Sequence, residues 1–158
     1  MRKIILLFVV LFSVGSFAQN SKLKGYNSVC KNPIYLKALG GTFEVGVNIG
    51  SVIKLPFILD TGASECVIPA YVAMTLYKNG LITKADFLDD KIYSLADGSE
   101  VRCRRIVIRK LVIGKYLLKN VEFAVSPNAD APLLLGQNAL KKLGNVSINY
   151  SNNTICVN

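Results

Sequence analysis

A short apolar run that ends in a carboxylate is the feature that most constrains this chain. The apolar residues 57–59 lead directly into Asp60, which is followed by four small residues, Thr61, Gly62, Ala63 and Ser64. A carboxylate at the end of such a run is costly to bury unless it is hydrogen-bonded. The small residues supply backbone amides and hydroxyl groups, and they leave room for a ligand. The pattern therefore predicts either a functional loop or an ordinary polar turn.

Alternating apolar residues place this loop at the end of a β-hairpin. From Thr42 to Ile49 every second residue is apolar, which is the period-2 pattern of a half-buried strand. Gly50-Ser51 predicts a tight turn, and the alternation resumes over residues 53–59, so the second strand would deliver Asp60. Pro56 has no backbone donor, which predicts a sheet edge or a bulge at that position.

The rest of the chain predicts short strands and two short helices. One helix is expected between Pro69 and Asn79, and a second over residues 137–143, where Gly144 ends it. Residues 81–90, with three aspartates, are expected to form a polar surface loop. A change of phase near Arg104-Arg105 predicts a bulge. Further strands are expected near residues 93–95, 101–113, 121–125, 133–136, 146–150 and 155–157. This order predicts a mainly β domain, closed as a barrel or packed as a sandwich.

The beginning of the sequence has the features of a secretory signal peptide over residues 1–18. Arg2 and Lys3 precede a short apolar core, and a small-x-small site precedes Gln19. A membrane anchor is disfavoured, because about 20 apolar residues are needed to span a bilayer. We therefore expect an exported protein, periplasmic or secreted, with no stable membrane anchor after signal removal. Residues 19–41 would form an N-terminal arm or linker, and residues 42–158 the folded domain.

The composition excludes several classes of function. The formal net charge is +9, but no dense Lys/Arg cluster with interleaved aromatic residues occurs, so we expect no nucleic-acid interface. The chain has no histidine, which excludes Ser-His and Cys-His nucleophile schemes. Without histidine or a C-x-x-C spacing, no zinc site and no other metal or cofactor is expected. Carboxylates, lysines and hydroxyl groups remain as the available catalytic groups.

Two distant elements together carry a resemblance to a known family. The first is the strand that leads into residues 60–64, and the second is Leu134-Leu135-Gly136-Gln137-Asn138, an apolar strand, a glycine and a helix. Between them lies a hairpin with Gly98 near its tip. In this order the elements resemble the retroviral-type, or retropepsin-like, aspartic proteases, in particular the bacterial single-domain exported members. The resemblance covers residues 42–157 and implies a closed, mainly β fold with two short helices, functional as a homodimer.

The resemblance also implies a role for each motif. The chain has a single Asp-Thr-Gly, so two Asp60 carboxylates, one from each subunit, would activate a water that hydrolyses a peptide bond of a polypeptide substrate. Thr61, Gly62, Ala63 and Ser64 would form the active-site loop, and Gly136 would pack beneath it as a structural residue. The flap that closes over substrate would be the hairpin tip Ala96, Asp97, Gly98 and Ser99.

The chain differs from the viral members of this family at two positions that stabilise their dimer. Viral members have an acidic residue at the position of Ser64 and an arginine at that of Gln137, and these residues form an ion pair that is missing here. Viral flaps are also richer in glycine. In similar dimers the chain ends pair in a shared sheet, so we hypothesise a disulfide between Cys30 and Cys156, within or between subunits. Cys66 and Cys103 would be free or paired with each other.

Two other functions fit the same residues. The first is a non-catalytic peptide-binding module on the same scaffold, which would hold a peptide between flap and cleft without cleaving it. The second is a disulfide-stapled structural β-domain, which would have no cleft. Cleavage of an unfolded protein that is lost in the variant Asp60→Asn would separate the protease from both.

Overall fold

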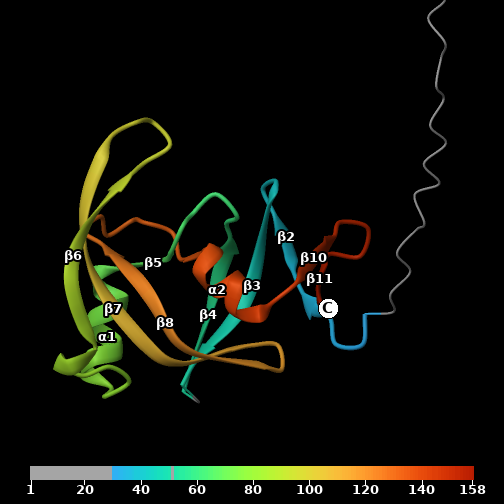
Figure 1. Ribbon diagram of the computed structural model, residues 1–158, viewed down its shortest axis with the longest axis horizontal. Helices are drawn as coiled ribbons and strands as arrows, with labels where there is room; N and C mark the ends of the chain where they lie inside the picture. The colour runs from blue at the N-terminus through green and yellow to red at the C-terminus, as the bar shows by residue number, and fades with distance from the viewer. Residues whose placement is uncertain (1–29, 51) are drawn as a thin grey trace, which may run out of the picture.

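Two β-sheets account for most of the computed structural model, which describes residues 30–50 and 52–158 (Figure 1). The larger sheet has the strand order β2-β3-β4-β9-β5-β8-β7-β6, and the smaller one the order β1-β11-β10. Strand β3 also pairs with β7, so the larger sheet closes on itself. The expected mainly β, closed fold with two short α-helices is confirmed for the described residues.

The elements follow one another in many short segments. The strands are β1 (Ile34–Tyr35), β2 (Lys37–Leu39), β3 (Thr42–Ile49), β4 (Ile53–Leu59), β5 (Cys66–Pro69), β6 (Phe87–Ser94), β7 (Glu100–Ile113), β8 (Tyr116–Ser126), β9 (Leu134–Leu135), β10 (Val146–Asn149) and β11 (Thr154–Val157). The helices are α1 (Ala70–Lys78), the 3-10 helix η1 (Lys84–Asp86) and α2 (Gln137–Leu143).

The hairpin that precedes Asp60 is formed by β3 and β4. The two strands pair antiparallel from Ile49↔Ile53 to Glu44↔Ile58, and Gly50 has a φ of 60° in the turn between them. Strand β9 pairs with β4 only at Ile58 and Leu59. Pro56 therefore lies where one side of β4 has no neighbouring strand, which confirms the predicted sheet edge.

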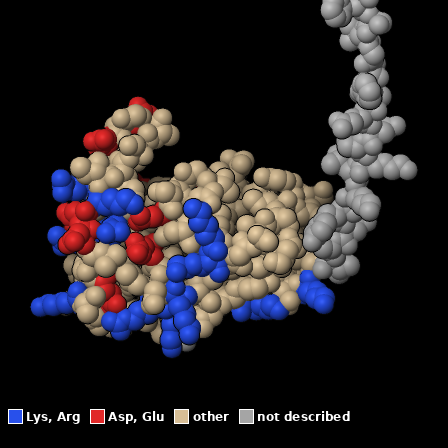
Figure 2. Space-filling model, in the orientation of Figure 1, with Lys and Arg blue, Asp and Glu red and all other residues tan. Residues whose placement is uncertain are grey.

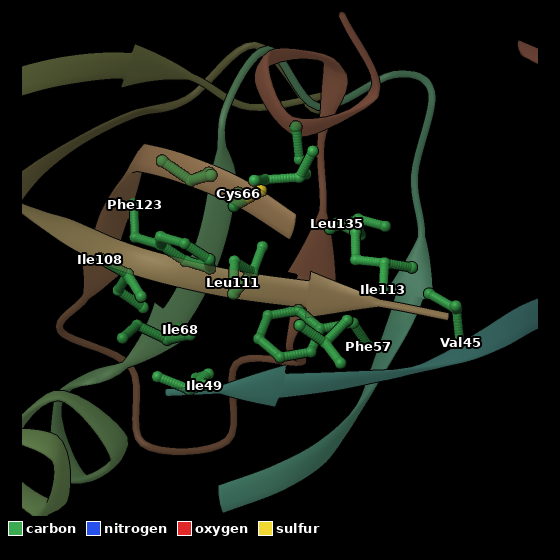
Figure 3. Close-up of a cluster of buried hydrophobic side chains, with 14 of the residues drawn as sticks. Val45, Ile49, Phe57, Cys66, Ile68, Ile108, Leu111, Ile113, Phe123 and Leu135 are labelled. Carbon is green, nitrogen blue, oxygen red and sulfur yellow. The ribbon is translucent and has the colours of Figure 1, made fainter. Parts of the chain in front are cut away.

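Apolar side chains from most strands of the larger sheet meet inside the closed barrel (Figure 3). Phe57 of β4 and Phe123 of β8 are fully buried, and their rings meet edge to face at 6.0 Å between centroids. Burial of one such side chain stabilises the fold by about 1.5–3 kcal/mol. Leu135 of β9 is also fully buried, so the strand that lies beside the Asp60 loop is fixed by the core.

Residues 81–90 do not form the predicted polar surface loop. Helix η1 and the first residues of β6 occupy this segment, and the Asp86 side chain is buried, with 5% of the residue exposed. Its carboxylate accepts hydrogen bonds from the Thr83 amide and hydroxyl, at 2.7 and 2.9 Å, and from Arg109 Nε at 2.7 Å. The prediction was wrong for Asp86 because Thr83 hydrogen-bonds, and Arg109 neutralises, a carboxylate that the composition alone suggests is solvated.

The predicted bulge lies on the partner strand. Leu88 pairs with Arg105 and Lys91 pairs with Cys103, so Asp89 and Asp90 of β6 both oppose Arg104 of β7. The change of phase near Arg104 that the sequence shows is therefore real, but the extra residue belongs to β6.

The first described residues and the C-terminal strand come together within one subunit. Strand β1 pairs with β11, and Cys30 and Cys156 form a disulfide with a Cα–Cα distance of 5.5 Å. Residues 30–41, the last part of the expected arm, thus contain β1 and β2 and join both sheets. The expected signal peptide, residues 1–18, lies outside the described residues. Cys66 and Cys103 are free and buried.

None of the helices in the described part of the chain is both long enough and apolar enough to cross a bilayer.

Candidate active site

Asp60 lies immediately after β4, at the point where β4 and β9 pair as parallel strands. Its backbone amide donates to the carbonyl oxygen of Leu135 at 3.1 Å, which continues that pairing by one residue. Its carboxylate oxygen Oδ1 accepts hydrogen bonds from the amides of Gly62 and Ala63, at 2.8 and 3.1 Å. These bonds offset the cost of placing a carboxylate at the end of an apolar strand. Both go to Oδ1, so Oδ2 stays available to a water or to a second carboxyl group.

The first turn of α2 holds the carbonyl groups of the same loop. The amides of Gln137 and Asn138 donate to the carbonyl oxygens of Ala63 and Ser64, at 2.9 and 3.2 Å. The first amides of a helix have no partner within the helix, and here the loop supplies one for each of these two. The side-chain amide Nε2 of Gln137 adds a third bond, of 2.7 Å, to the carbonyl oxygen of Thr61. The loop is therefore fixed by backbone contacts at both of its ends.

Gly136 lies directly against the loop, beneath the residues that follow Asp60. A Cβ atom at this position would lie 2.4 Å from the carbonyl oxygen of Glu65 and 3.0 Å from that of Ala63. These are backbone atoms, so only glycine fits without moving the loop.

Asn138 links three elements, although the sequence gives it no role beyond its place in the motif. Its Oδ1 accepts from the amide of Cys66 at 3.0 Å and from the Cys66 thiol at 3.2 Å, and its Nδ2 donates to the carbonyl oxygen of Glu122 at 2.7 Å. Burial raises the pKa of the Cys66 thiol to about 11. This thiol therefore stays protonated at neutral pH and is not a nucleophile.

The four predicted flap residues form the tip of the β6–β7 hairpin. All of them are exposed, and Gly98 has a φ of 82°, which glycine adopts without strain. Asp97 Oδ1 accepts from the Ser99 hydroxyl and amide, at 2.6 and 2.9 Å. These two bonds, the hydroxyl's first, lower the pKa of Asp97 and fold the tip back on itself. Within the described residues no hydrogen bond joins this tip to the Asp60 loop.

Glu65, the residue after the loop, contacts the β6–β7 hairpin that carries the flap residues. The motifs in the sequence do not predict this contact. Glu65 Oε1 accepts from Lys91 Nζ at 2.6 Å, and Oε2 accepts from the Tyr93 hydroxyl at 2.5 Å. Lys91 and Tyr93 are alternate residues of β6 and so share one face of the strand. The sequence gives one signal for this contact. An acidic residue follows Asp-Thr-Gly-Ala-Ser, and a basic and a phenolic residue are spaced two apart on β6.

A mainly apolar hollow of about 390 Å³ lies beside the loop. Residues that line it include Leu59, Thr61, Gln137, Leu140, Val146 and Tyr150. Tyr150 is 71% exposed, which is high for a large aromatic side chain. Figure 2 shows charged side chains around β6 and β7, along the lower edge and over α2 in the middle of this face, whereas the area over β10 and β11 is largely uncharged.

Comparison with known proteins identifies the family. Residues 45–142 match the family model described as "gag-polyprotein putative aspartyl protease". The structure is similar to that of a retropepsin-like aspartic protease from Rickettsia conorii, with a TM-score of 0.56 and 24% sequence identity over 75% of this chain and 92% of that chain. No curated protein matches the chain. The structural match, at 24% identity, shows the fold. The family model covers more than half of the chain and shows the family. The chain therefore belongs to the family of retropepsin-like aspartyl proteases.

Proposed function

We propose that this protein is an aspartic endopeptidase whose active site contains two Asp60 carboxyl groups, one from each subunit of a homodimer. The observation that carries the proposal is the setting of Asp60. Its Oδ1 is held by two loop amides and its Oδ2 stays available, and the loop itself is braced by Gly136 and the start of α2. The family to which the chain belongs supports the same reaction.

The reaction would need no metal and no covalent intermediate. Two adjacent carboxyl groups cannot both ionise cheaply, so the pair would hold one proton. The ionised Asp60 takes a proton from the water, whose oxygen attacks the peptide carbonyl carbon, while the protonated Asp60 donates its proton to the carbonyl oxygen. The tetrahedral gem-diol intermediate then collapses: the C–N bond breaks, and the leaving nitrogen takes a proton from the carboxyl group that first acted as the base. As the new C=O bond forms, one hydroxyl group of the intermediate gives its proton to the other carboxylate, so the pair again holds one proton.

The second carboxyl group would come from a second copy of the chain. The sequence has a single Asp-Thr-Gly, and a two-fold axis beside Thr61 would bring two Asp60 loops together. The hollow next to Thr61 and the exposed ring of Tyr150 form a mainly apolar area, with Lys141 as its one charged lining residue, that a second copy would cover. Strands β1 and β11 already pair within one subunit, so this dimer would not need to exchange them.

Neutral hydrogen bonds would replace the ion pair that supports viral dimers. Gln137 stands where those enzymes have arginine, and its side chain still reaches the Asp60 loop through the carbonyl oxygen of Thr61. This contact braces the loop without a charged partner at Ser64.

The substrate would be an extended polypeptide, and the reaction would take place outside the cytoplasm. The β6–β7 hairpin, with Ala96 to Ser99 at its tip, would close over the bound chain and exclude water. The Cys30–Cys156 disulfide fits an oxidising compartment. Export to the periplasm or the medium would use residues 1–18 as a leader.

A proteolysis assay on an unfolded protein at mildly acidic pH tests this function. We expect the wild type to cleave and Asp60→Asn to be inactive while it keeps its fold and solution mass. Asp130→Asn is the matched control, because Asp130 is an exposed aspartate whose only hydrogen bond among the described residues is made by its backbone amide, to Asn128. A wild type that binds peptide but cleaves none between pH 3 and 8 would favour the peptide-binding module.

Mixing of subunits tests the shared site. If each active site uses both Asp60 residues, adding an equal amount of Asp60→Asn chains and allowing exchange lowers the activity of the wild-type chains to about half. Unchanged activity after complete exchange would contradict a site built from two subunits.

A further inference from the structure

The outer part of the β6–β7 hairpin leaves the sheet and projects as a two-stranded arm. The pairing of β7 with β8 ends at Arg104↔Val125, and the bulge in β6 lies at the same level. Residues 91–103, here called the arm, extend beyond this point (Figure 1, upper left). Every residue from Ser94 to Glu100 is exposed. An isolated two-stranded hairpin is only marginally stable in water, so the position of the arm depends on contacts at its base.

Glu65 provides such a contact from the floor of the candidate site. Its two carboxylate oxygens take one donor each from the arm, Lys91 Nζ at 2.6 Å and the Tyr93 hydroxyl at 2.5 Å. Lys91 and Tyr93 are the residues of β6 just beyond the bulge on the side that faces Glu65. The Glu65 side chain is 11% exposed, so water competes poorly for these bonds.

The backbone of Glu65 is held in place by its neighbours. The carbonyl group of Glu65 packs against Gly136, and the amide of the next residue, Cys66, is bonded to Asn138. Any relative movement must therefore occur in the arm and not in the loop that carries Asp60.

The charges favour this contact. Burial alone would raise the pKa of Glu65, but the hydrogen bonds from Lys91 and Tyr93 and the positive charges of Lys91 and Arg105 hold it below its ordinary value. Burial and the bond to Glu65 raise the pKa of Tyr93 well above its ordinary value. An ionised acceptor therefore faces a protonated phenol, which makes a strong, charge-assisted bond. Lys91 is half exposed, so its ion pair contributes less.

We propose that Glu65 is a positioning residue that anchors the base of the arm through Tyr93 and Lys91 and so aims the flap tip over the Asp60 loop. This role rests on the proposed protease function, because it concerns how the flap captures substrate. Glu65 does not act on the reacting atoms. Loss of the anchor therefore raises KM for an extended peptide and leaves the pH dependence of kcat, which reports the Asp60 pair, unchanged.

Tyr93→Phe removes the phenol oxygen and nothing else, so it is the main variant. Hydrogen–deuterium exchange followed by mass spectrometry should show faster exchange of the amides in residues 94–103, by about three- to tenfold. Glu65→Gln keeps one acceptor and should give a smaller increase in the same peptides. Tyr116→Phe is the matched control, because the Tyr116 hydroxyl also makes one hydrogen bond, of 3.2 Å to the carbonyl oxygen of Asn32, and Tyr116 lies at the end of the β7–β8 pairing opposite to the arm.

The outcomes separate this inference from the proposed function. If the amides of the arm exchange at the same rate in Tyr93→Phe as in the wild type, the proposed anchor is overturned. Faster amide exchange throughout the chain, and not in the arm alone, also overturns it. A KM that rises together with a shifted pH profile of kcat also overturns it, since Glu65 would then act on the reacting groups. If the wild type cleaves nothing, the protease function fails, but the exchange experiment still decides whether Glu65 anchors the arm.

Discussion

The side-chain amide of Gln137 donates a 2.7 Å hydrogen bond to the backbone carbonyl oxygen of Thr61, and so joins the first turn of α2 to the loop that carries Asp60. The acceptor is a main-chain atom, so the contact does not depend on which side chain stands at position 61. It depends on the donor at position 137 alone.

Replacing this donor should weaken the loop. We expect Gln137→Ala to lower the free energy of unfolding by about 1 kcal/mol, the usual net value of one hydrogen bond. Urea denaturation measures the effect. Lys142→Ala is the control, because Lys142 is exposed on the same helix. Equal effects of the two substitutions would show that the bond to Thr61 contributes nothing.

A methyl group at Gly136 should be poorly tolerated. In Gly136→Ala the new Cβ would lie 2.4 Å from the Glu65 carbonyl oxygen, so the loop or β9 must move. We expect a loss of about 2–3 kcal/mol in the free energy of unfolding, measured by urea denaturation.

Gly46→Ala is the matched control for this substitution. Its Cβ would meet only Lys54 Cε, at 2.9 Å, and a flexible side chain can move away. We expect a change of less than about 1 kcal/mol for this variant. A similarly small change for Gly136→Ala would mean that the loop adapts, contrary to the tight packing described above.

The sequence predicts the elements whose pattern is local. Period-2 alternation predicts β3 and β4, because a strand with one buried face alternates by geometry. The bounds of α2, residues 137–143, are also predicted, since Gly136 and Gly144 limit a segment that has room for only two turns. The Asp60 loop is recognisable for a similar reason, because all of its residues are contiguous.

Contacts between distant residues are the part that the sequence does not show. Glu65 is 26 residues from Lys91 and 28 from Tyr93, and Asn138 is 72 residues from Cys66. A single polar residue has no periodicity that reveals its partner. The same limit explains the wrong prediction at residues 81–90, where the partner of Asp86 is Arg109, 23 residues away.

Asp86 should make the stability of the domain depend on pH in the acidic range. Burial raises its pKa, but the bonds from Thr83 and the ion pair with Arg109 outweigh burial and hold the pKa below its ordinary value near 3.8. A carboxyl group whose pKa is lowered by folding stabilises the fold above its ordinary pKa. That contribution is lost as the pH falls through the lower, folded-state pKa.

The variant Asp86→Asn tests this contribution. We expect it to be less stable than the wild type by about 1.5–3 kcal/mol at pH 7, with a difference that shrinks as the pH falls from about 4 toward 2. Urea denaturation at several pH values measures both quantities. Glu65, whose pKa is also lowered, titrates in both proteins, so the difference between them isolates Asp86. Asp130→Asn, at an exposed position, should show no such difference, and a gap for Asp86→Asn that stays constant with pH would contradict the assignment.

The Cys30–Cys156 disulfide should contribute more to stability than any single hydrogen bond. It joins residues 126 positions apart, and closing so long a loop restricts the unfolded chain, which typically stabilises a protein by about 2–4 kcal/mol. We expect the double variant Cys30→Ser/Cys156→Ser to lose about this amount in denaturation experiments.

Reduction provides the control for the disulfide. A reducing agent should destabilise the wild type and leave the double variant unchanged, because Cys66 and Cys103 are already free thiols. Thiol titration of the unfolded, unreduced protein should find the two thiols of these residues. Four reactive thiols would show that Cys30 and Cys156 are not joined. Residues 30–41 would then still be joined to the rest of the domain by the pairing of β1 with β11 and of β2 with β3, and by the bond of the Tyr116 hydroxyl to Asn32.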